Sequence, residues 1–162
     1  MIAEVELKKT NAENKNGEMI LFVCTGNTCR SPMAEAVFNR FYADWEKKRY
    51  AESAGLFADG SPISANAENA LRSIGIENFT HISRNVTEEL MEKASRVVGI
   101  TASHASSLIL AFPQYASKIT SLPTDIPDPY GGDEKEYEGC LRMILSALRE
   151  MFGEITGGSP EK

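Results

Sequence analysis

Hydrophobic and polar positions alternate along most of the chain in segments typical of strands and helices in turn. Residues 19–24 form a continuous apolar run of strand length, as in a strand buried on both faces. Further runs of strand type follow at residues 50–54, 96–101 and 118–122. Helical segments separate these runs. The alternation predicts an α/β fold, with four parallel strands in one sheet and helices on both of its faces.

Five helices are expected. In chain order they lie at residues 31–45, at residues 64–74, from Thr87 onward, at residues 103–112 and at about residues 133–152. The first is predicted to start with Ser31 at the N-cap and Pro32 in the first turn. Its apolar stripe consists of Met33, Val37, Phe41 and Trp45. Ser64 and Thr87 are predicted N-caps of the second and third helices.

The two ends of the chain differ from the segment between them. Residues 1–18 are polar and without period, which predicts a flexible N-terminal extension, with Ile2, Val5 and Leu7 as a candidate edge strand. Residues 154–162 are expected to form a flexible tail. Residues 19–153 are therefore predicted to form one domain.

Composition limits the possible classes of protein. Of the 162 residues, 42% are apolar and 25% are charged, close to the average of globular proteins. No apolar run approaches the roughly 20 residues of a membrane span, and the N-terminus lacks the apolar stretch of a signal peptide, so a cytoplasmic protein is expected. A net charge of −6 disfavours nucleic-acid binding. The three cysteines show neither disulfide-framework nor zinc-ligand spacing, so no metal and no cofactor is expected.

The segment Cys24-Thr-Gly-Asn-Thr-Cys-Arg-Ser-Pro32 carries the candidate chemistry. It follows the first strand and leads into a helix N-terminus, where the helix dipole favours an anion. Gly26 permits a positive φ, so that successive N–H groups can converge on that anion. Arg30 supplies a planar fork suited to phosphate oxygens. Further hydroxyl donors are Thr25, Thr28 and Ser31. The loop therefore suits a tetrahedral oxyanion bound above a sulfur atom.

The same surroundings favour a thiolate over a thiol. A cysteine at a helix N-terminus beside a cation has its pKa lowered from about 8.5 to roughly 4–7, so Cys24 is expected to be a nucleophile. A C-x5-R spacing alone also arises by chance. In that case the cysteine is simply buried and the arginine lies on the surface. The strand–loop–helix context argues against that simpler interpretation.

From Met19 to about Phe152, the chain resembles the low-molecular-weight protein tyrosine phosphatases. The resemblance rests on the C-x5-R-S-P loop, on Ser53-Ala-Gly55, on His81 with Arg84, and on Asp128-Pro-Tyr-Gly131. It implies a four-stranded parallel α/β fold and catalysis through a phosphocysteine intermediate.

Catalytic roles follow from this resemblance position by position. Cys24 resembles the nucleophile, Arg30 the group that clamps the phosphate, and Asp128 the general acid. A basic leaving group requires an acid within hydrogen-bond reach, which is consistent with the last role. Pro127 and Pro129 would stiffen the loop that aims Asp128. Taken alone, Asp128 would be an ordinary Asp-Pro turn residue.

Other residues of the motifs receive supporting roles. Those expected to bind substrate are Thr25, Gly26, Asn27, Thr28, Cys29, Ser31 and Tyr130. Asn27, Ser31, Ser53 and His81 resemble a network that holds the loop in shape, although capping, turn formation and simple burial remain open for the last three. Cys29 resembles a cysteine that pairs with the nucleophile on oxidation, or is a packed apolar residue. Cys140 is predicted to lie in the core, and His104 on a helix surface.

Thr28 and the segment Asp128-Pro-Tyr-Gly-Gly132 resemble the protein arginine phosphatases of this family, so phosphoarginine is favoured as substrate. The alternative that the chain is a protein tyrosine phosphatase of the same family stays open. An arsenate reductase would need relay cysteines, whereas only Cys140 lies downstream. A non-catalytic phosphoprotein-binding module would require neither Cys24 nor Asp128. The expected partners are phosphorylated proteins, with no nucleic acid and no membrane, and the sequence does not predict an oligomeric state.

Overall fold

Four parallel strands form the centre of the computed structural model, which describes residues 17–155. They are β1 (Glu18–Cys24), β2 (Arg49–Gly55), β3 (Arg96–Gly99) and β4 (Ile119–Ser121), arranged in the order β2-β1-β3-β4. The predicted parallel sheet is confirmed. The predicted flexible ends lie largely outside the described residues, and Glu18, which was assigned to the N-terminal extension, opens β1.

Strand β1 is central in the sheet and is buried on both faces. Alternate residues enter two separate apolar clusters, with Ile20 and Phe22 in one and Leu21 and Val23 in the other. Successive side chains of a strand point to opposite faces of the sheet. When both faces are covered, every position of the strand is buried and apolar. This explains the continuous apolar run in the sequence.

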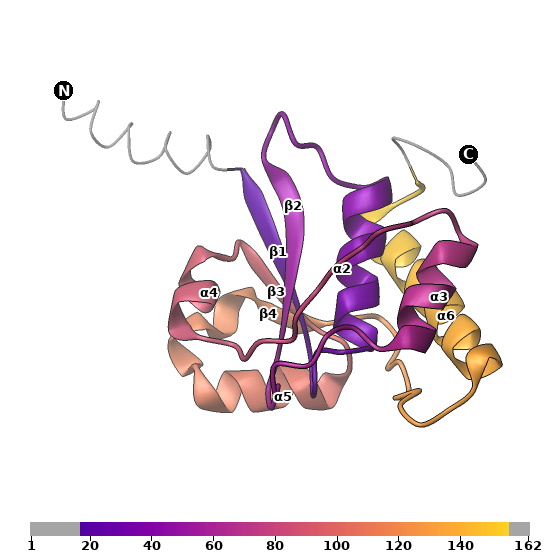
Figure 1. Ribbon diagram of the computed structural model, residues 1–162. Helices are drawn as coiled ribbons and strands as arrows, with labels where there is room; N and C mark the ends of the chain where they lie inside the picture. The colour runs from indigo at the N-terminus through magenta and orange to yellow at the C-terminus, as the bar shows by residue number, and fades with distance from the viewer. Residues whose placement is uncertain (1–16, 156–162) are drawn as a thin grey trace.

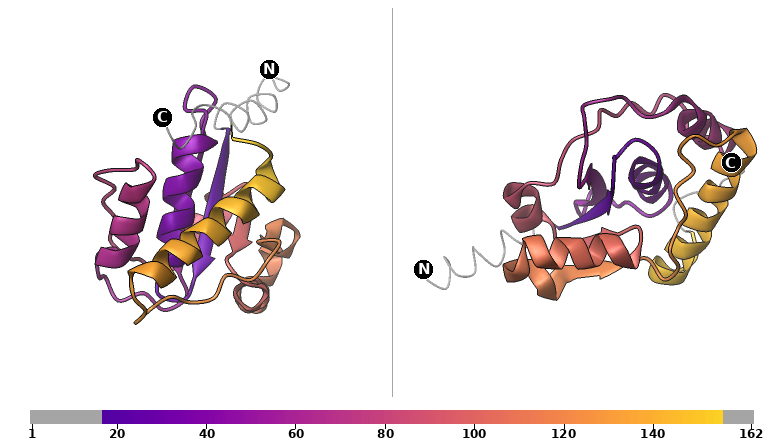
Figure 2. Two further views of the ribbon diagram at one scale, coloured as in Figure 1. Left: turned by 90° about the vertical axis from the view of Figure 1, so that its right-hand side faces the viewer. Right: turned by 90° about the horizontal axis from the view of Figure 1, so that it is seen from below.

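In the described part of the chain, five α-helices cover the two faces of the sheet (Figure 1). Helices α2 (Arg30–Phe41), α3 (Ala65–Ser73) and α6 (Glu134–Phe152) pack around the larger apolar cluster. Helices α4 (Glu88–Lys93) and α5 (Ala102–Ala111) lie with the smaller cluster on the other face, as the two views of Figure 2 show. A 3₁₀ helix, η1 (Pro113–Lys118), leads into β4.

Two helix starts agree with the caps that the sequence predicts. Ser64 accepts a hydrogen bond from the N–H of Ala67, and Thr87 accepts one from Leu90. Asp133 forms a reciprocal capping box with Glu136 at the start of α6. Each cap satisfies a backbone donor that the first helical turn leaves without a partner.

The start of α2 differs from the prediction. Its N-cap is Cys29, so Ser31 and Pro32 lie within the first turn. The Ser31 hydroxyl is not used as a cap, because it is buried and contacts Cys24 and Asn27 instead.

The end of α2 is also earlier than predicted. The N–H groups of Tyr42 and Ala43 both donate to the carbonyl oxygen of Phe38, which closes the helix. Trp45 therefore lies beyond the helix, is 61% exposed, and stacks on Tyr50 at 5.5 Å between ring centroids. Its place in the predicted apolar stripe is wrong.

Two further boundaries move by a few residues. Strand β3 ends at Gly99 instead of residue 101, because Thr101 becomes the N-cap of α5. Helix α5 therefore starts at Ala102, one residue before the predicted start. Strand β4 starts at Ile119, because Lys118 completes the 3₁₀ helix.

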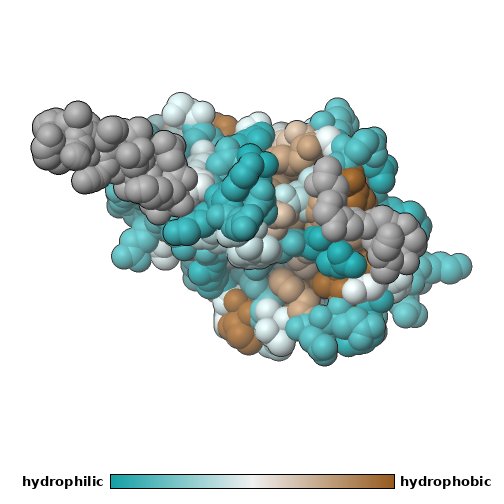
Figure 3. Space-filling model, turned by 90° about the horizontal axis from the view of Figure 1, so that it is seen from above, coloured by the Kyte–Doolittle hydropathy of each residue, from teal (hydrophilic) through white to brown (hydrophobic). Residues whose placement is uncertain are grey.

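Parallel strands bring their carboxyl ends to one edge of the sheet. Cys24 pairs in register with Gly55, and Val23 with Gly99. This edge lies at the bottom of Figure 1, where the loops after β1 and β2 run toward α2 and α3. The opposite end of the molecule, shown in Figure 3, is mainly hydrophilic with small apolar patches. Within residues 17–155, no helix is long and apolar enough to cross a membrane.

Two leucines of α5 give a matched test of this packing. Leu108 is fully buried in the smaller apolar cluster, whereas Leu110 is 83% exposed. Leu108→Ala is expected to lower the free energy of unfolding by about 2–5 kcal/mol, because it removes buried methyl groups and leaves a cavity. Leu110→Ala should change it by less than about 0.5 kcal/mol. Urea denaturation of both variants measures the difference, and equal losses would contradict the packing of α5.

Candidate functional site

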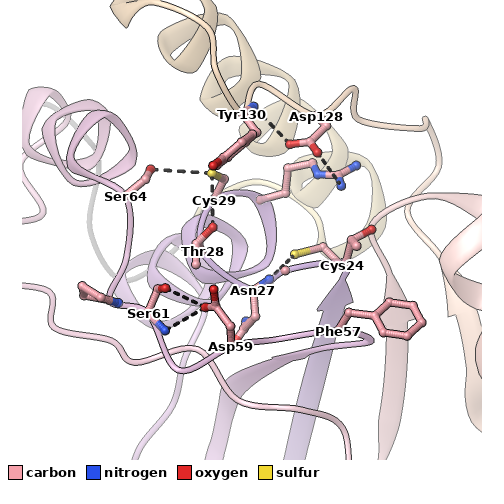
Figure 4. Close-up of a pocket in the computed structure, with 14 residues that line it drawn as sticks. Cys24, Asn27, Thr28, Cys29, Phe57, Asp59, Ser61, Ser64, Asp128 and Tyr130 are labelled. Carbon is pink, nitrogen blue, oxygen red and sulfur yellow. Dashed lines mark hydrogen bonds and ion pairs between the residues drawn. The ribbon is translucent and has the colours of Figure 1, made fainter.

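A cavity of about 440 Å³ opens at the carboxyl edge of the sheet. Its floor is formed by residues 24–30, here called the Cys24 loop. Its walls come from the segment after β2 and from residues 123–132, here called the Asp128 loop. Side chains on these walls belong to Phe57, Asp59, Ser61, Pro62, Ser64, Asp128 and Tyr130 (Figure 4). The site therefore lies where parallel α/β sheets usually bind ligands.

Cys24 lies beneath this cavity at the end of β1 and is 2% exposed. Its sulfur accepts a hydrogen bond from the Asn27 N–H at 3.3 Å and lies 2.9 Å from the Ser31 hydroxyl oxygen. That oxygen already accepts a hydrogen bond from the Asn27 amide nitrogen at 2.8 Å. The Ser31 proton can therefore be donated to the sulfur, and the Ala54 carbonyl oxygen, at 3.5 Å, is a more distant acceptor. Two donors thus converge on the atom that would carry negative charge.

The pKa of Cys24 departs from the sequence expectation. Burial raises the pKa of this thiol, while the Ser31 hydroxyl, the Arg30 charge and the Asn27 N–H act to lower it. The expected lowered pKa is therefore wrong for this closed geometry, since the desolvation of the sulfur outweighs its donors. Ionisation of Cys24 depends on those donors being correctly placed.

Asn27 holds the Cys24 loop in place. Its backbone is left-handed, with φ of 60°, and the residue is fully buried. The side-chain amide donates to Ser31 and, at 3.1 Å, to Ser53, while its oxygen accepts the Arg84 N–H at 3.0 Å. A left-handed non-glycine residue costs of order 1–3 kcal/mol and persists where its surroundings fix it. Here β2 and the segment around Arg84 provide those surroundings.

His81 closes the same network. Its Nε2 lies 3.0 Å from both the carbonyl oxygen and the side-chain oxygen of Asn27. Both atoms are acceptors, so Nε2 carries the proton and donates. Burial lowers the pKa of His81, which favours the neutral ring. The loop-supporting residues expected from the sequence, Ser53 and His81, are therefore both in contact with Asn27.

A partly buried carboxyl group lies behind this network. Ser53 donates to Glu35 of α2 at 2.6 Å, and the Nδ1 of His81 is 3.9 Å from the same carboxyl oxygen. Burial raises the pKa of Glu35 to about 7, against the lowering effects of Ser53 and Arg84. Glu35 was not predicted as a site residue, because in the sequence it is only one polar position of a helix.

The two glycines of the loop region have different roles. Gly55 allows close approach, since a Cβ atom there would lie 2.6 Å from the Thr25 carbonyl oxygen and 3.0 Å from the Asn27 Cβ. The expectation that Gly26 takes a positive φ is wrong, because Asn27 is the left-handed residue of the loop. A Cβ on Gly26 would meet only Thr28 Oγ1, at 4.0 Å. Glycine there leaves the floor of the cavity open.

Arg30 and Asp128 connect the Cys24 loop to the Asp128 loop. The buried Arg30 donates from Nη1 to the Ile126 carbonyl oxygen at 3.0 Å, and its Nη2 is 3.6 Å from an Asp128 carboxylate oxygen. The side chain of Asp128 is 52% exposed and accepts the N–H of Tyr130 at 3.1 Å. A buried cation and an exposed carboxylate therefore share one cavity with Cys24.

Thr28 and Cys29 form the side of the floor nearest α3. Thr28 lines the cavity, and its carbonyl oxygen accepts the N–H of Ser64 at 3.0 Å. The sulfur of Cys29 lies 3.6 Å from the Ser64 hydroxyl and 3.7 Å from that of Thr28 (Figure 4). It also lies 3.3 Å from the Tyr137 hydroxyl. Both Cys24 and Cys29 are free thiols in this structure.

The cavity walls combine aromatic and acidic groups. Phe57 is 78% exposed and Tyr130 is 76% exposed, so that flat apolar surfaces stand on two sides of the opening (Figure 4). The hydroxyl and N–H of Ser61 hold the pKa of Asp59 below its usual value. Phe57 and Asp59 were not predicted from the sequence, which gives no periodic signal in this loop.

Three other predicted residues are placed as follows. Ser31 lies beneath the floor and not along the lining of the cavity. Cys140 is buried in the core, as expected, near the Pro127 carbonyl oxygen. His104, expected on a helix surface, is only 6% exposed, so that prediction is wrong. Its spacing from Thr101 is that of a capping box, the signal that would have placed it at the start of α5. No group of three potential metal ligands occurs among residues 17–155.

The carboxyl group of Glu35 predicts a pH-dependent stability. Because its pKa rises from 4.5 to about 7 on folding, the folded chain binds more protons than the unfolded chain between these values. Stability from this group is therefore present at low pH and lost as pH rises toward 7. Glu35→Gln should gain about 1–3 kcal/mol of unfolding free energy relative to the parent between pH 5 and pH 8.

Urea denaturation at the two pH values measures this gain. Glu46→Gln, at an exposed position, is the control and should show none. A parent–variant difference that is the same at pH 5 and pH 8 would contradict the raised pKa of Glu35.

Comparisons with known proteins agree with this geometry. The family model described as "Low molecular weight phosphotyrosine protein phosphatase" matches residues 19–158. A protein-arginine-phosphatase of Bacillus subtilis is 35% identical over 145 residues, covering 84% of this chain and 95% of that protein. One of Geobacillus stearothermophilus is 39% identical over 143 residues, covering 81% and 93%.

A solved structure adds chemical information. It is a mutant of the YwlE arginine phosphatase with a phosphorylated active-site serine, 35% identical, with a TM-score of 0.74, covering 82% of this chain and 92% of that one. An arsenate reductase of Halalkalibacterium halodurans is also similar, 33% identical over 140 residues, covering 86% of this chain and 92% of that protein. The match of the family model across the fold and the site shows that the chain belongs to the low molecular weight phosphotyrosine protein phosphatase family.

Proposed function

We propose that this chain is a phosphoprotein phosphatase with Cys24 as nucleophile and phosphoarginine as the favoured substrate. The observation that carries the proposal is the shared cavity, in which Cys24 lies beneath the floor with the buried Arg30 and the exposed Asp128 beside it. The structure of a related phosphatase with a phosphorylated active-site serine supports a covalent step. The cytoplasmic location predicted from the sequence remains a prediction.

In the first step, the Cys24 thiolate attacks phosphorus. The sulfur–phosphorus bond forms as the bond to the leaving nitrogen or oxygen breaks, and protonated Asp128 gives its proton to that leaving atom. The guanidinium of Arg30 and the N–H groups of the Cys24 loop stabilise the charge on the transferring phosphoryl oxygens.

In the second step, the Asp128 carboxylate accepts a proton from water as that water attacks phosphorus. The sulfur–phosphorus bond breaks, and inorganic phosphate and the Cys24 thiolate are released. The hydrogen bond from Ser31 lowers the cost of expelling the thiolate.

Two observations support phosphoarginine over phosphotyrosine. Thr28 places a hydroxyl at the cavity floor, which is better suited to a polar guanidino group than to an apolar ring. The acidic group of Asp59 lines the same cavity and would attract a cationic group. Two relatives named as protein-arginine-phosphatases agree with this choice.

Phosphotyrosine is the second candidate substrate. The exposed rings of Phe57 and Tyr130 offer faces on which a phenyl ring would stack. The same faces also accept a guanidinium plane, so they do not separate the two substrates.

The other two alternatives receive less support. The only downstream cysteine, Cys140, is buried in the core, which disfavours the disulfide relay of an arsenate reductase. Pairing of Cys24 with Cys29 on oxidation remains a prediction. The presence of both Cys24 and Asp128 in the cavity argues against a module that only binds phosphoproteins.

Two substitutions test the catalytic roles. Cys24→Ser is expected to lower kcat at least about 1,000-fold on every substrate, since the nucleophile is lost. Asp128→Asn should lower kcat about 100-fold or more on substrates with basic leaving groups, but less than about 10-fold on an activated aryl phosphate. Steady-state kinetics on both kinds of substrate measures this difference.

Phosphate binding distinguishes an enzyme from a binder. Cys24→Ser should retain phosphate binding in calorimetry while losing turnover. Equal losses of Asp128→Asn on both kinds of leaving group would refute the general-acid role, and undiminished turnover in Cys24→Ser would refute the nucleophile.

Thr28→Ile tests the substrate choice. The parent is expected to show a higher kcat/KM on a phosphoarginine peptide than on the matched phosphotyrosine peptide. Thr28→Ile should shift that ratio toward phosphotyrosine by about 10-fold or more, because it replaces a hydroxyl at the floor with an apolar surface. Thr28→Ser, which keeps the hydroxyl, is the control. A preference for phosphotyrosine in the parent would replace the phosphoarginine assignment.

A further inference from the structure

His104 lies between the start of α5 and the Cys24 loop. It occupies the third position of α5, is 6% exposed, and places its Nε2 2.9 Å from the Thr25 hydroxyl oxygen. Thr25 directly follows Cys24 and lines the cavity. Helix α5, which contributes no residue to the lining, thus contacts the loop that carries the nucleophile.

Neighbouring donors determine which ring nitrogen of His104 is protonated. The Thr101 N–H lies 3.2 Å from Nδ1, and a backbone N–H is always a donor. Nδ1 must therefore accept, and in the neutral ring the proton is on Nε2. His104 consequently donates to the Thr25 oxygen, and the Thr25 hydroxyl proton remains free for another acceptor.

Burial and the Arg30 charge keep the His104 ring neutral. Together they lower the pKa of His104 to about 4, while the carboxylates of Asp128 and Asp125 act in the opposite direction. The direction of the hydrogen bond is therefore constant at neutral pH. His104 contributes an oriented donor and no charge.

The position of the ring depends on close packing at the end of β3. A Cβ atom on Gly99 would lie 2.7 Å from the Ala105 nitrogen and 3.0 Å from the His104 Cβ, so glycine is required for α5 to start this close to the strand. In the same turn, the Ala102 N–H donates to Asp125 of the Asp128 loop at 2.8 Å. The first turn of α5 thus contacts both loops that shape the cavity.

We propose that His104 is a positioning residue that holds Thr25 with its hydroxyl proton directed at the oxyanion bound above Cys24. This role deepens the proposed function and rests on it, because the bound oxyanion is the phosphoryl group or the released phosphate. Thr25 is the group that contacts the oxyanion, and His104 acts through it. The remaining contacts of His104, to the backbone and hydroxyl of Thr101, cap α5.

A double-mutant cycle with inorganic phosphate tests this role. Thr25→Val removes the hydroxyl, and His104→Asn retains a side-chain acceptor for the Thr101 N–H but does not reach Thr25. Each variant is expected to weaken phosphate binding about 5-fold in calorimetry, as for one hydrogen bond. The double variant should bind phosphate no more weakly than Thr25→Val alone, because both substitutions remove one interaction.

Rescue and control variants separate positioning from a general effect on folding. His104→Gln extends an amide donor toward Thr25 and should bind phosphate within about 2-fold of the parent. Ser103→Ala, at an exposed position in the same turn, should not change binding. Thermal denaturation of every variant verifies that it is folded. If His104→Asn does not fold, the single variants Thr25→Val and His104→Gln still test the role.

The outcomes distinguish this inference from the proposed function. Additive losses in the double variant, or unchanged phosphate binding in His104→Asn, would overturn the positioning role. A parent that binds phosphate with the expected coupling but hydrolyses neither phosphoarginine nor phosphotyrosine peptides would overturn the proposed function and leave the contact itself intact.

Discussion

The left-handed backbone of Asn27 is the constraint on which the site depends. With φ of 60°, this residue turns the Cys24 loop back on itself, so that its N–H faces the sulfur of Cys24. The conformation is unfavourable by about 1–3 kcal/mol for a residue other than glycine. Several side-chain hydrogen bonds, worth about 0.5–1.5 kcal/mol each, offset it, and they include those with Ser53 and with the Arg84 N–H. The shape of the loop is thus fixed by β2 and the segment after it, and not by the loop sequence alone.

This anchoring also sets the directions of the protons around the nucleophile. Because Asn27 donates to Ser31, the Ser31 hydroxyl is free to donate to Cys24. On the other side of the loop, His104 donates to Thr25 and leaves that hydroxyl free in the same way. Such preorganised donors stabilise developing negative charge without reorganising during the reaction. They also oppose the rise in the pKa of Cys24 that burial causes.

The alternation of strands and helices and the caps Ser64 and Thr87 were predictable from the sequence, because local patterns determine them. The gathering of Cys24, Arg30 and Asp128 was expected from the family resemblance, since Asp128 alone has only the local pattern of a turn residue. The predictions that were wrong concern features that depend on contacts between distant segments. Ser31 has the local pattern of an N-cap, but its hydroxyl is taken up by Cys24 and Asn27. Gly26 has the flexibility for a positive φ, yet the left-handed residue is Asn27, which follows it. Hydrogen bonds with the distant residues Ser53 and Arg84 hold Asn27 in that conformation. The burial of His104 depends on the close approach that Gly99 allows.

The site divides into a buried half and an exposed half. The groups proposed to hold the oxyanion and the sulfur, such as Arg30, Ser31 and Asn27, are buried. Asn27 and Ser31 are also joined by a hydrogen bond, so substitution of either disturbs the other. Phe57, Tyr130 and Asp128 are exposed and have few such links. Substrate choice can therefore change through the exposed half, together with Thr28 at the floor, while the chemistry stays the same. This arrangement accounts physically for relatives of one family that are named as protein-arginine-phosphatase and as protein-tyrosine-phosphatase.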